Sequence, residues 1–600
     1  MQTIVERYKQ IIAENQKKLS RIRRRIYRIG TIRLLLFVAG IVGAIYFRQG
    51  GWTVVLPVIL VCLVPFLILM KVHDRLFYAK DYTQNIIQIN ENELAAIDYR
   101  TDSFEDGKEF QDPAHSYSYD LDLFGEHSLF QYINRTSTSF GRKRLAGWFI
   151  RPLDCKAEIE SRQEAVRELA SLLDFRQWFQ ATGMTYKGKL SDGDSLLQWA
   201  QSHTEFRHSR LLSVLSYLFP GLNLLFLVLG MAGVLSFNWL TGAFIFSVIV
   251  SIGLQKRITL FQISYENKLV ILGSYVRQMK LMEALHPACA ALQACCNHLD
   301  TGREPASEAI RRLSKEMNAL NQRNNILAYV LLNGLLFWEV RQVMRIERWK
   351  ERHAAGLPLW LDAIGEMDAL CSLAGFAYNH PDYTYPVATE TPFTLCAESM
   401  GHPLIHRDRC VRNDIRMEKR PCFIIITGAN MAGKSTYLRT IGVNFLLACI
   451  GAPVCAGRMT FYPAHLVTGL RTTDSLNDNE SYFFAELKRL KEIIDRLNTG
   501  EELFIILDEI LKGTNSVDKQ KGSLSLVKQF IRLQANGIIA THDLQLGSLA
   551  ELYPDHVRNY CFEAGIVDNE LTFSYKMQKG VAQNMNACFL MEKMGIFVQE

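Results

Sequence analysis

Two long stretches of this chain are almost free of charged residues. Between Leu211 and Leu254 there is no Asp, Glu, Lys or Arg, and between Leu34 and Met70 only Arg48 is charged. Each stretch is long enough for two helices and contains turn-forming residues near its middle, at 48–51 and at 236–238. A helix of about 20 apolar residues spans the hydrocarbon core of a bilayer. The pattern therefore predicts two helical hairpins in a membrane, at residues 34–70 and 211–254, with about four transmembrane helices.

The ends of these segments carry residues that suit a membrane interface. Trp52 and Trp239 begin apolar segments, where aromatic side chains favour the interfacial region. Residues 34–47 give only about 21 Å of helix at 1.5 Å per residue. We expect that segment to cross a bilayer with Arg33 and Arg48 extending their charged ends toward the two surfaces. Helices buried in a soluble core are the alternative.

Basic residues flank both hairpins on the side away from their turns. They are Lys17, Lys18, Arg21, Arg23, Arg24, Arg25, Arg28 and Arg33 before the first, Lys71 and Arg75 after it, and Arg207, Arg210, Lys256 and Arg257 around the second. Because positive flanks stay in the cytoplasm, we expect a multi-pass protein of the inner (cytoplasmic) membrane with both chain ends in the cytoplasm. The first basic run suits anionic lipid. Nucleic acid is its competing partner.

Outside the apolar stretches the pattern divides the chain further. Apolar residues recur at helical spacing over 1–29, 257–285 and 306–348, and β structure begins near residue 393. We predict a basic helical arm at 1–33, the first hairpin at 34–70, a linker at 71–120 that is most polar over 101–120, a helical core at 121–385 containing the second hairpin, and an α/β domain at 386–600.

The net charge of +6 is mild for 600 residues and does not by itself indicate a nucleic-acid partner. Thirteen cysteines without a C-x-x-C pair favour reduced thiols facing the cytosol.

One motif in the α/β domain carries specific chemistry. The residues Gly428, Ala429, Asn430, Met431, Ala432, Gly433, Lys434, Ser435 and Thr436 match G-x-x-x-x-G-K-[ST] between an apolar run and a segment without helix breakers. Strand, glycine loop and helix is the context in which this pattern binds the phosphates of a nucleotide. We expect Lys434 to reach the β- and γ-phosphates of ATP and the Ser435 hydroxyl to bind Mg²⁺.

Two further apolar runs end in polar residues that complete such a site. Residues 503–507 are followed by Asp508 and Glu509, and residues 537–541 by His542. A carboxylate at the tip of a buried parallel strand can hold Mg²⁺ through water, which we predict for Asp508. We predict that Glu509 activates the attacking water and that His542 senses the γ-phosphate. The sequence thus predicts an ATP hydrolase.

The motifs resemble those of the MutS family of DNA mismatch-repair ATPases. The run 427–439, TGANMAGKSTYLR, is similar to the phosphate loop of that family, in which Asn-Met is distinctive. The resemblance covers most of residues 121–590. It continues at 123–125, 128–130 and 151–153 in the helical core, at 401–405 and 413–415 before the loop, and at 508–509, 513–514, 518, 540–542 and 572–576 after it.

The resemblance implies more than the motif does by itself. It implies an ABC-type P-loop ATPase fold that works as a homodimer, with Ser481 contacting the γ-phosphate bound by the partner. Ser481 also suits a helix N-cap, and the two roles are compatible. Asn515 and Asp518 are expected on a loop that communicates across the dimer. Mismatched or branched DNA is the partner that the resemblance implies.

The chain also departs from the family pattern. The residues before 121 leave no room for mismatch-recognition and connector domains, and 211–254 looks membrane-embedded where a DNA-clamping insertion is expected. Phe124-Gly125-Glu126 matches the spelling of the mismatch reader but lies inside a core motif, which favours coincidence. Cys410 stands where relatives often have an aromatic residue on the adenine. We predict a membrane-anchored MutS-like ATPase. The alternative is an ABC-like membrane ATPase, or a scaffold that switches protein partners without binding DNA.

Overall fold

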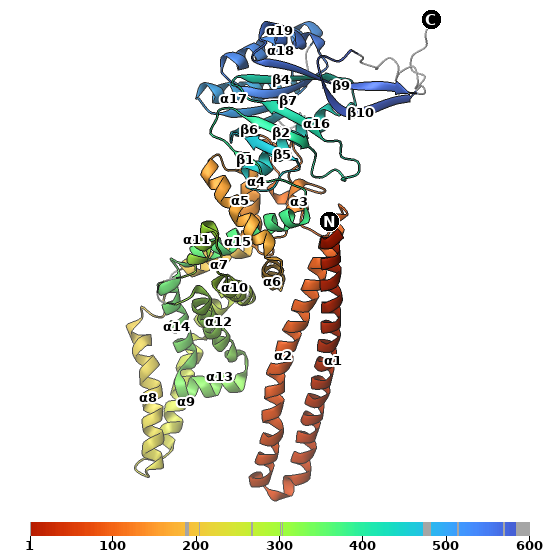
Figure 1. Cartoon of the computed structure of the whole chain (residues 1–600). Helices are drawn as coiled ribbons and strands as arrows, with labels where there is room; N and C mark the ends of the chain where they lie inside the picture. The colour runs from red at the N-terminus through yellow and green to blue at the C-terminus, as the bar shows by residue number, and fades with distance from the viewer. Residues whose placement is uncertain are drawn as a thin grey trace.

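The computed structural model describes residues 2–185, 191–202, 204–265, 268–300, 302, 304–471, 482–512, 515–567 and 570–583. Its parts follow one another from one end of the molecule to the other (Figure 1). An α/β domain with two sheets occupies one end, a helical body lies beneath it, and two helical hairpins point away from the α/β domain. This order puts the two most apolar regions at the end opposite the candidate phosphate loop.

The first hairpin consists of two very long helices. Helix α1 (Gln2–Tyr46) runs through the predicted basic arm and the first apolar segment without a break, and η1 (Phe47–Gly50) leads into α2 (Trp52–Ile97). Gly51 turns the chain with φ of 71°. The prediction of a linker from residue 71 is wrong as far as Ile97. Residues 71–97 contain no Gly or Pro, and their apolar face packs Ile86 and Ile89 against α1 and α6.

The helical body follows a short irregular segment that includes η2 (Lys108–Phe110). It is built from α3 (Leu129–Ile133), α4 (Ser139–Ile150), α5 (Lys156–Ser171), α6 (Leu173–Gly183), α7 (Ser191–Gln201), α10 (Lys268–Glu283), α11 (Ala290–Asn297), α12 (Ala306–Leu320) and α15 (Leu357–Asn379). Helix α15 is buried on nearly all sides and packs against α4 and α5. Its apolar residues belong to one large core cluster that continues into the α/β domain.

The second hairpin consists of α8 (Arg210–Met231) and α9 (Asn238–Tyr265). Two further helices pack on it, α13 (Ile326–Leu336) and α14 (Trp338–His353), which meet at an angle of 81°. The helical pattern of 306–348 is therefore interrupted twice, by η3 (Asn321–Asn324) and by Phe337, whose φ is 50°. By length and composition, α1, α2, α8 and α9 could each cross a membrane, and the bent pair α13–α14 could supply a fifth span.

The α/β domain contains two sheets. The smaller has the order β1 (Val387–Ala388), β5 (Arg458–Phe461), β2 (Leu395–Met400), β3 (Asn413–Met417). The larger has the order β10 (Glu570–Lys579), β9 (Val557–Val567), β4 (Cys422–Gly428), β8 (Asn536–Thr541), β7 (Leu503–Asp508), β6 (His465–Gly469). Strands β9, β4, β8, β7 and β6 run parallel, so their carboxyl ends share one edge.

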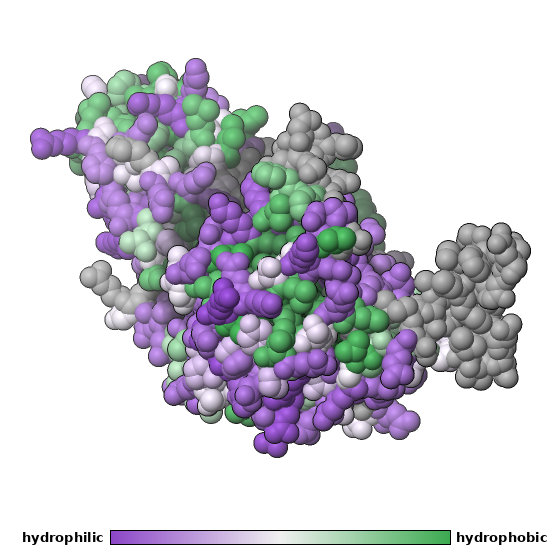
Figure 2. Space-filling model, turned by 90° about the horizontal axis from the view of Figure 1, so that it is seen from above, coloured by the Kyte–Doolittle hydropathy of each residue, from purple (hydrophilic) through white to green (hydrophobic). Residues whose placement is uncertain are grey.

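Helices cover the large sheet on both faces. Helix α16 (Lys434–Cys449) contributes to the core cluster that it shares with the helical body. Helices α17 (Tyr482–Asn498) and α18 (Ser516–Arg532) enclose a second cluster, close to η4 (Leu544–Ser548) and α19 (Leu549–Leu552). Seen from above, this end of the molecule is covered largely by hydrophilic residues with hydrophobic ones between them (Figure 2). The helices with exposed apolar residues, α1, α2, α8 and α9, extend toward the other end (Figure 1).

A buried carboxylate joins the segment before α3 to the α/β domain. Asp120 accepts hydrogen bonds from the Thr468 hydroxyl (2.7 Å), from the backbone N–H groups of Leu470 and Arg471, and from the Arg489 guanidinium (2.9 Å). Its side chain is only 1% exposed. A buried charge needs several such donors to offset its lost hydration. The end of the predicted linker, at Asp120, is therefore held against the α/β domain.

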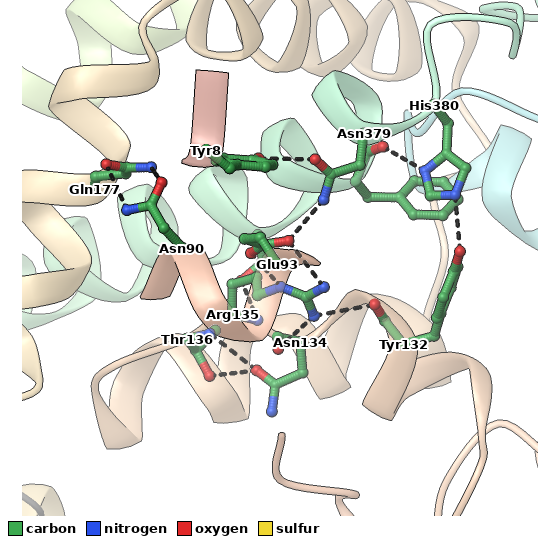
Figure 3. Close-up of polar contacts among 12 residues, drawn as sticks. Tyr8, Asn90, Glu93, Tyr132, Asn134, Arg135, Thr136, Gln177, Asn379 and His380 are labelled. Atoms are coloured by element: carbon green, nitrogen blue, oxygen red, sulfur yellow. Dashed lines mark hydrogen bonds and ion pairs between the residues drawn. The ribbon is translucent and has the colours of Figure 1, made fainter. Parts of the chain in front are cut away.

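A polar network joins the first hairpin to the helical body (Figure 3). The Tyr8 hydroxyl donates to Asn379 Oδ1 (2.8 Å), and Asn379 Nδ2 donates to Glu93 Oε2 (2.6 Å). The other oxygen of Glu93 accepts from Arg135 Nε (2.6 Å), and both side chains of this ion pair are at least 92% buried. Helices α1, α2 and α15 and the segment before α4 therefore meet at one carboxylate.

A neutral histidine continues the network toward the α/β domain. Burial lowers the pKa of His380 to about 4, so its ring is uncharged at pH 7. Nδ1 lies 2.8 Å from the Phe376 carbonyl oxygen and must carry the proton, so Nε2 accepts from the Tyr132 hydroxyl at 2.9 Å. Tyr99 stacks on Tyr132, with 5.6 Å between the ring centroids, and approaches His406.

We expect Arg135→Met to lower the free energy of unfolding by about 3–5 kcal/mol, because it leaves the Glu93 carboxylate buried without its counter-charge. Tyr8→Phe removes one neutral hydrogen bond from the same network and should cost about 1 kcal/mol. Denaturant unfolding in detergent measures both. Equal effects for the two variants would contradict the central place of the ion pair.

Candidate functional site

The candidate phosphate loop begins where β4 ends. Gly428 has φ of 153°, and a Cβ atom there would lie 2.5 Å from the Phe562 carbonyl oxygen, so no larger residue fits. Met431 and Gly433 also have positive φ, at 66° and 103°. Repeated positive φ values turn backbone N–H groups toward one concave side, which is how such loops bind anions. The strand, loop and helix predicted from the sequence are therefore present, with α16 starting at Lys434.

The Lys434 ammonium lies over the loop. Nζ donates to the carbonyl oxygens of Gly428 and Ala429, both at 2.9 Å, and lies 3.3 Å from Nε2 of His542. Burial lowers the pKa of Lys434, while Asp508 and Glu509 oppose that shift. The sequence-predicted lysine and histidine are thus neighbours, although 108 residues separate them.

Two carboxylates lie at the same sheet edge. Asp508 ends β7 opposite Ala540 of β8, and the Glu509 N–H donates to the Ala540 carbonyl oxygen (2.9 Å). Glu509 has φ of 53°, an unfavourable value that turns the chain sharply after the strand. Its Oε1 lies 2.8 Å from His542 Nε2. The hydrogen bond and charge of His542, with help from Lys512, lower the pKa of Glu509 to about 2.

The other predicted residues fall around this centre. Ser435 and Thr436 are exposed on the first turn of α16, and Asn430 and Met431 are exposed at the tip of the loop, while Ala432 is buried. Ser481 lies outside the described residues. Asn515 caps α18, accepting from the Asp518 N–H (2.9 Å). The catalytic, metal-binding and dimer roles of these residues stay predictions.

A small cavity of about 150 Å³ adjoins the loop. Gly433 and Thr436 line one side of it, and His402, Cys410 and Tyr575 line others. A Cβ atom at Gly433 would lie 3.0 Å from the Tyr575 ring, so that ring covers the loop closely. Cys410 was predicted at this place from the sequence, but Tyr575 was not. Only the folding of β10 beside β9 and β3 brings that ring to the loop.

Phe124 is not available to read a base. It is 5% exposed and packs against Phe110, Phe130 and Phe149, with ring centroids 5.3–6.2 Å apart. An intercalating aromatic must be exposed to reach a base step. The likeness of residues 124–126 to a mismatch-reading motif is therefore a coincidence of sequence, as predicted.

Known proteins resemble both the α/β domain and the helical body of this chain. The family model of MutS domain V matches residues 424–596, and that of MutS domain III matches 114–374. MutS protein homolog 4 of Homo sapiens is 31% identical over 235 residues, which are 38% of this chain and 24% of that protein. DNA mismatch repair protein MutS of Aquifex pyrophilus is 32% identical over 286 residues, 47% of this chain and 32% of that protein.

The α/β domain and the helical body are thus those of a MutS-type protein. Both matching models belong to one family and together cover well over half of the chain, and the chain belongs to the MutS family. The aligned part spans no more than about a third of the length of these two relatives.

We predict that His542→Gln raises the pKa of Glu509 toward its ordinary value of 4.5. In the wild type the unfolded chain binds a proton at Glu509 between pH 4.5 and 2 while the folded protein does not. This contribution to stability is complete above pH 4.5 and is lost as the pH falls toward 2. The difference in unfolding free energy between wild type and variant should therefore shrink across that window. His556→Gln, whose ring contacts a backbone carbonyl, is the control. A constant difference would refute the coupling.

Proposed function

We propose that this chain binds and hydrolyses ATP in its α/β domain. The convergence of Lys434, His542 and Glu509 beside a complete G-x-x-x-x-G-K-S loop supports this most directly. The family supports it as well, since its domain V model matches the same residues. The helical body would then respond to nucleotide through the core that it shares with α16.

Each residue has a definite task in this proposal. Lys434 exchanges the loop carbonyls for β- and γ-phosphate oxygens, and the loop N–H groups bind the phosphate chain. Ser435 and Asp508 are the residues that would hold Mg²⁺, which when bound neutralises phosphate charge. One carboxylate and one hydroxyl suit an ion whose remaining ligands are water and phosphate. No cluster of three metal-ligating side chains occurs in the described ranges, and such a site needs none.

Glu509 is better suited to orient the attacking water than to remove a proton from it. A carboxylate with a pKa of about 2 is a weak base, but it is always ionised and accepts a hydrogen bond from the attacking water. His542 fixes its orientation at 2.8 Å and lies 3.3 Å from the Lys434 ammonium. The histidine can therefore report on the γ-phosphate through either neighbour. The cavity beside Gly433 would take the adenine, with the Tyr575 ring in place of an aromatic at 410.

The protein would act as a homodimer through its α/β domains. In this proposal Ser481 of each chain approaches the γ-phosphate bound by the other, and Asn515 and Asp518 lie at the same interface. The family relationship supports this arrangement. Closure of two such domains on ATP would move the attached helical bodies.

We further propose that the chain is anchored in the cytoplasmic membrane by its two hairpins, with the α/β domain on the cytoplasmic side. Helices α1, α2, α8 and α9 have the length and composition of membrane spans. The most apolar windows of α1 and α2 contain no buried residue, although apolar side chains in water are unfavourable. The basic residues at 17–33 would contact anionic lipid headgroups.

DNA is the partner we propose for the helical body. Similar proteins, such as the relative from Aquifex pyrophilus, are named DNA mismatch repair protein MutS. Mismatched or branched DNA fits that relationship, while the buried Phe124 argues against reading a mismatch in the manner its spelling suggested. A membrane scaffold that switches protein partners is the alternative if DNA is not bound.

We expect Lys434→Ala to abolish ATP binding, and Glu509→Gln to bind ATP while turnover falls by about 10²–10⁴. Loss of the water-orienting group should also trap the ATP-bound dimer. Equilibrium binding, phosphate release and sedimentation measure the three properties. Lys419→Ala, which alters an exposed lysine of the same domain, is the control. Normal turnover in Glu509→Gln would show that another group positions the water.

Filter binding of the detergent-solubilised protein tests the DNA proposal. Branched or mismatched DNA should be retained at low salt, and retention should fall steeply as salt rises, because phosphate contacts release counterions. ATP should change the affinity if the dimer cycle moves the helical body. Absence of retention for duplex, mismatched and branched DNA at low salt would favour the scaffold.

A further inference from the structure

Helix α13 presents an unpartnered apolar stripe. Leu327, Leu331 and Leu335 follow one another at four-residue spacing and are 75%, 55% and 42% exposed, with Ile326 beside them at 79%. Asn325 caps the helix by accepting from the Leu327 and Ala328 N–H groups, so its start is well defined. Such a stripe on an ordered helix is unfavourable in water and favourable at the surface of a bilayer.

The end of α13 is fixed to the middle of the second hairpin. Asn223 of α8 donates to the Gly334 and Leu335 carbonyl oxygens (2.8 and 3.1 Å), and the Ser247 hydroxyl of α9 donates to the Asn333 carbonyl oxygen (2.8 Å). Both donors are buried and lie near the midpoints of their apolar segments. Figure 1 shows α13 lying across the long axis of the hairpin. It therefore marks a level halfway along α8 and α9.

Charged side chains lie on the body side of that level. Helix α14 turns away from α13 and runs beside the first half of α8, where the Arg341 guanidinium lies 5.8 Å from the Tyr217 ring and Arg207 pairs with Glu351. Arg345 and Arg348 are exposed on α14. A hairpin inserted over its whole length would put these arginines into hydrocarbon, where charged side chains are strongly unfavourable.

The tip half of the hairpin extends beyond these arginines of α14. From Leu224 to Phe246 no residue is charged, and apolar side chains are exposed on all sides, among them Leu224, Leu225, Val228, Met231, Val234, Phe237, Trp239, Ile245 and Phe246. The helical part of this tip is about 12–15 Å long at 1.5 Å per residue. That is roughly half of the ~30 Å hydrocarbon core.

We propose that the membrane surface lies at the level of α13. Helix α13 lies along that surface with its leucine stripe among the outer parts of the acyl chains, and the α8–α9 hairpin enters one leaflet only, up to Asn223 and Ser247. The occupant of the stripe is lipid. This inference rests on the proposed membrane anchor and refines it for the second hairpin.

Depth-dependent fluorescence quenching tests the arrangement in the full chain. An environment-sensitive fluorescent amino acid is introduced by codon suppression at Leu331, at Val234 in the hairpin tip, or at Arg345 as a control on α14. Each protein is reconstituted into vesicles of anionic phospholipid that carry a spin label either near the headgroup or near the end of the acyl chain. Carbonate washing of the vesicles before each measurement tests the anchor itself.

The proposal predicts opposite profiles at the two probes. Leu331 should be quenched at least threefold more by the shallow label than by the deep one, Val234 at least threefold more by the deep label, and Arg345 mainly by iodide in the water. Shallow quenching at Val234 with deep quenching at Leu331 would mean that the hairpin spans, and would overturn the proposal. Iodide quenching of Leu331 equal to that of Arg345 would also overturn it. Protein lost in the carbonate wash would instead refute the anchor.

Discussion

The parallel pairing of β4, β8 and β7 is the constraint on which the candidate site depends. Because these strands point the same way, the phosphate loop, Asp508 and His542 all emerge at one edge, although 34 to 114 residues of chain separate them. Their apolar side chains are buried on both faces, which leaves the polar tips as the only hydrated parts. A one-residue slip of β7 would remove Glu509 from His542 and leave Lys434 without its acidic neighbours.

Local signals predicted the elements of this site well. Runs such as 423–427 and 503–507 are short, wholly apolar and bounded by polar residues, so their strand character does not depend on distant contacts. Residues 71–97 were predicted as a linker because a helix with few positions facing a core has a mostly polar sequence. The buried stripe of this helix consists of Ile86, Ile89 and their neighbours. Tyr575 was missed for a different reason, since nothing in its own segment indicates that β10 will cover Gly433.

The contacts that join the α/β domain, the helical body and the first hairpin could not be predicted from the sequence. Asp120 and Glu93 look like ordinary surface acids in the printed sequence, yet each is buried among donors from distant segments. Asp120 holds the segment before α3 against the α/β domain, and Glu93 holds the first hairpin against the helical body. Motion in the α/β domain would thus be transmitted to the first hairpin through charge pairs that break only at high cost.

The position of Asn379 has a consequence for biosynthesis. Glu93 is made 286 residues before the amide that it accepts from. At typical elongation rates of 5–20 residues per second, roughly 15 to 60 s pass before that partner leaves the ribosome. During this interval the α1–α2 hairpin lacks its contact with Asn379. Assembly of the nascent chain is therefore ordered in time, and docking of the hairpin onto α15 is a late step.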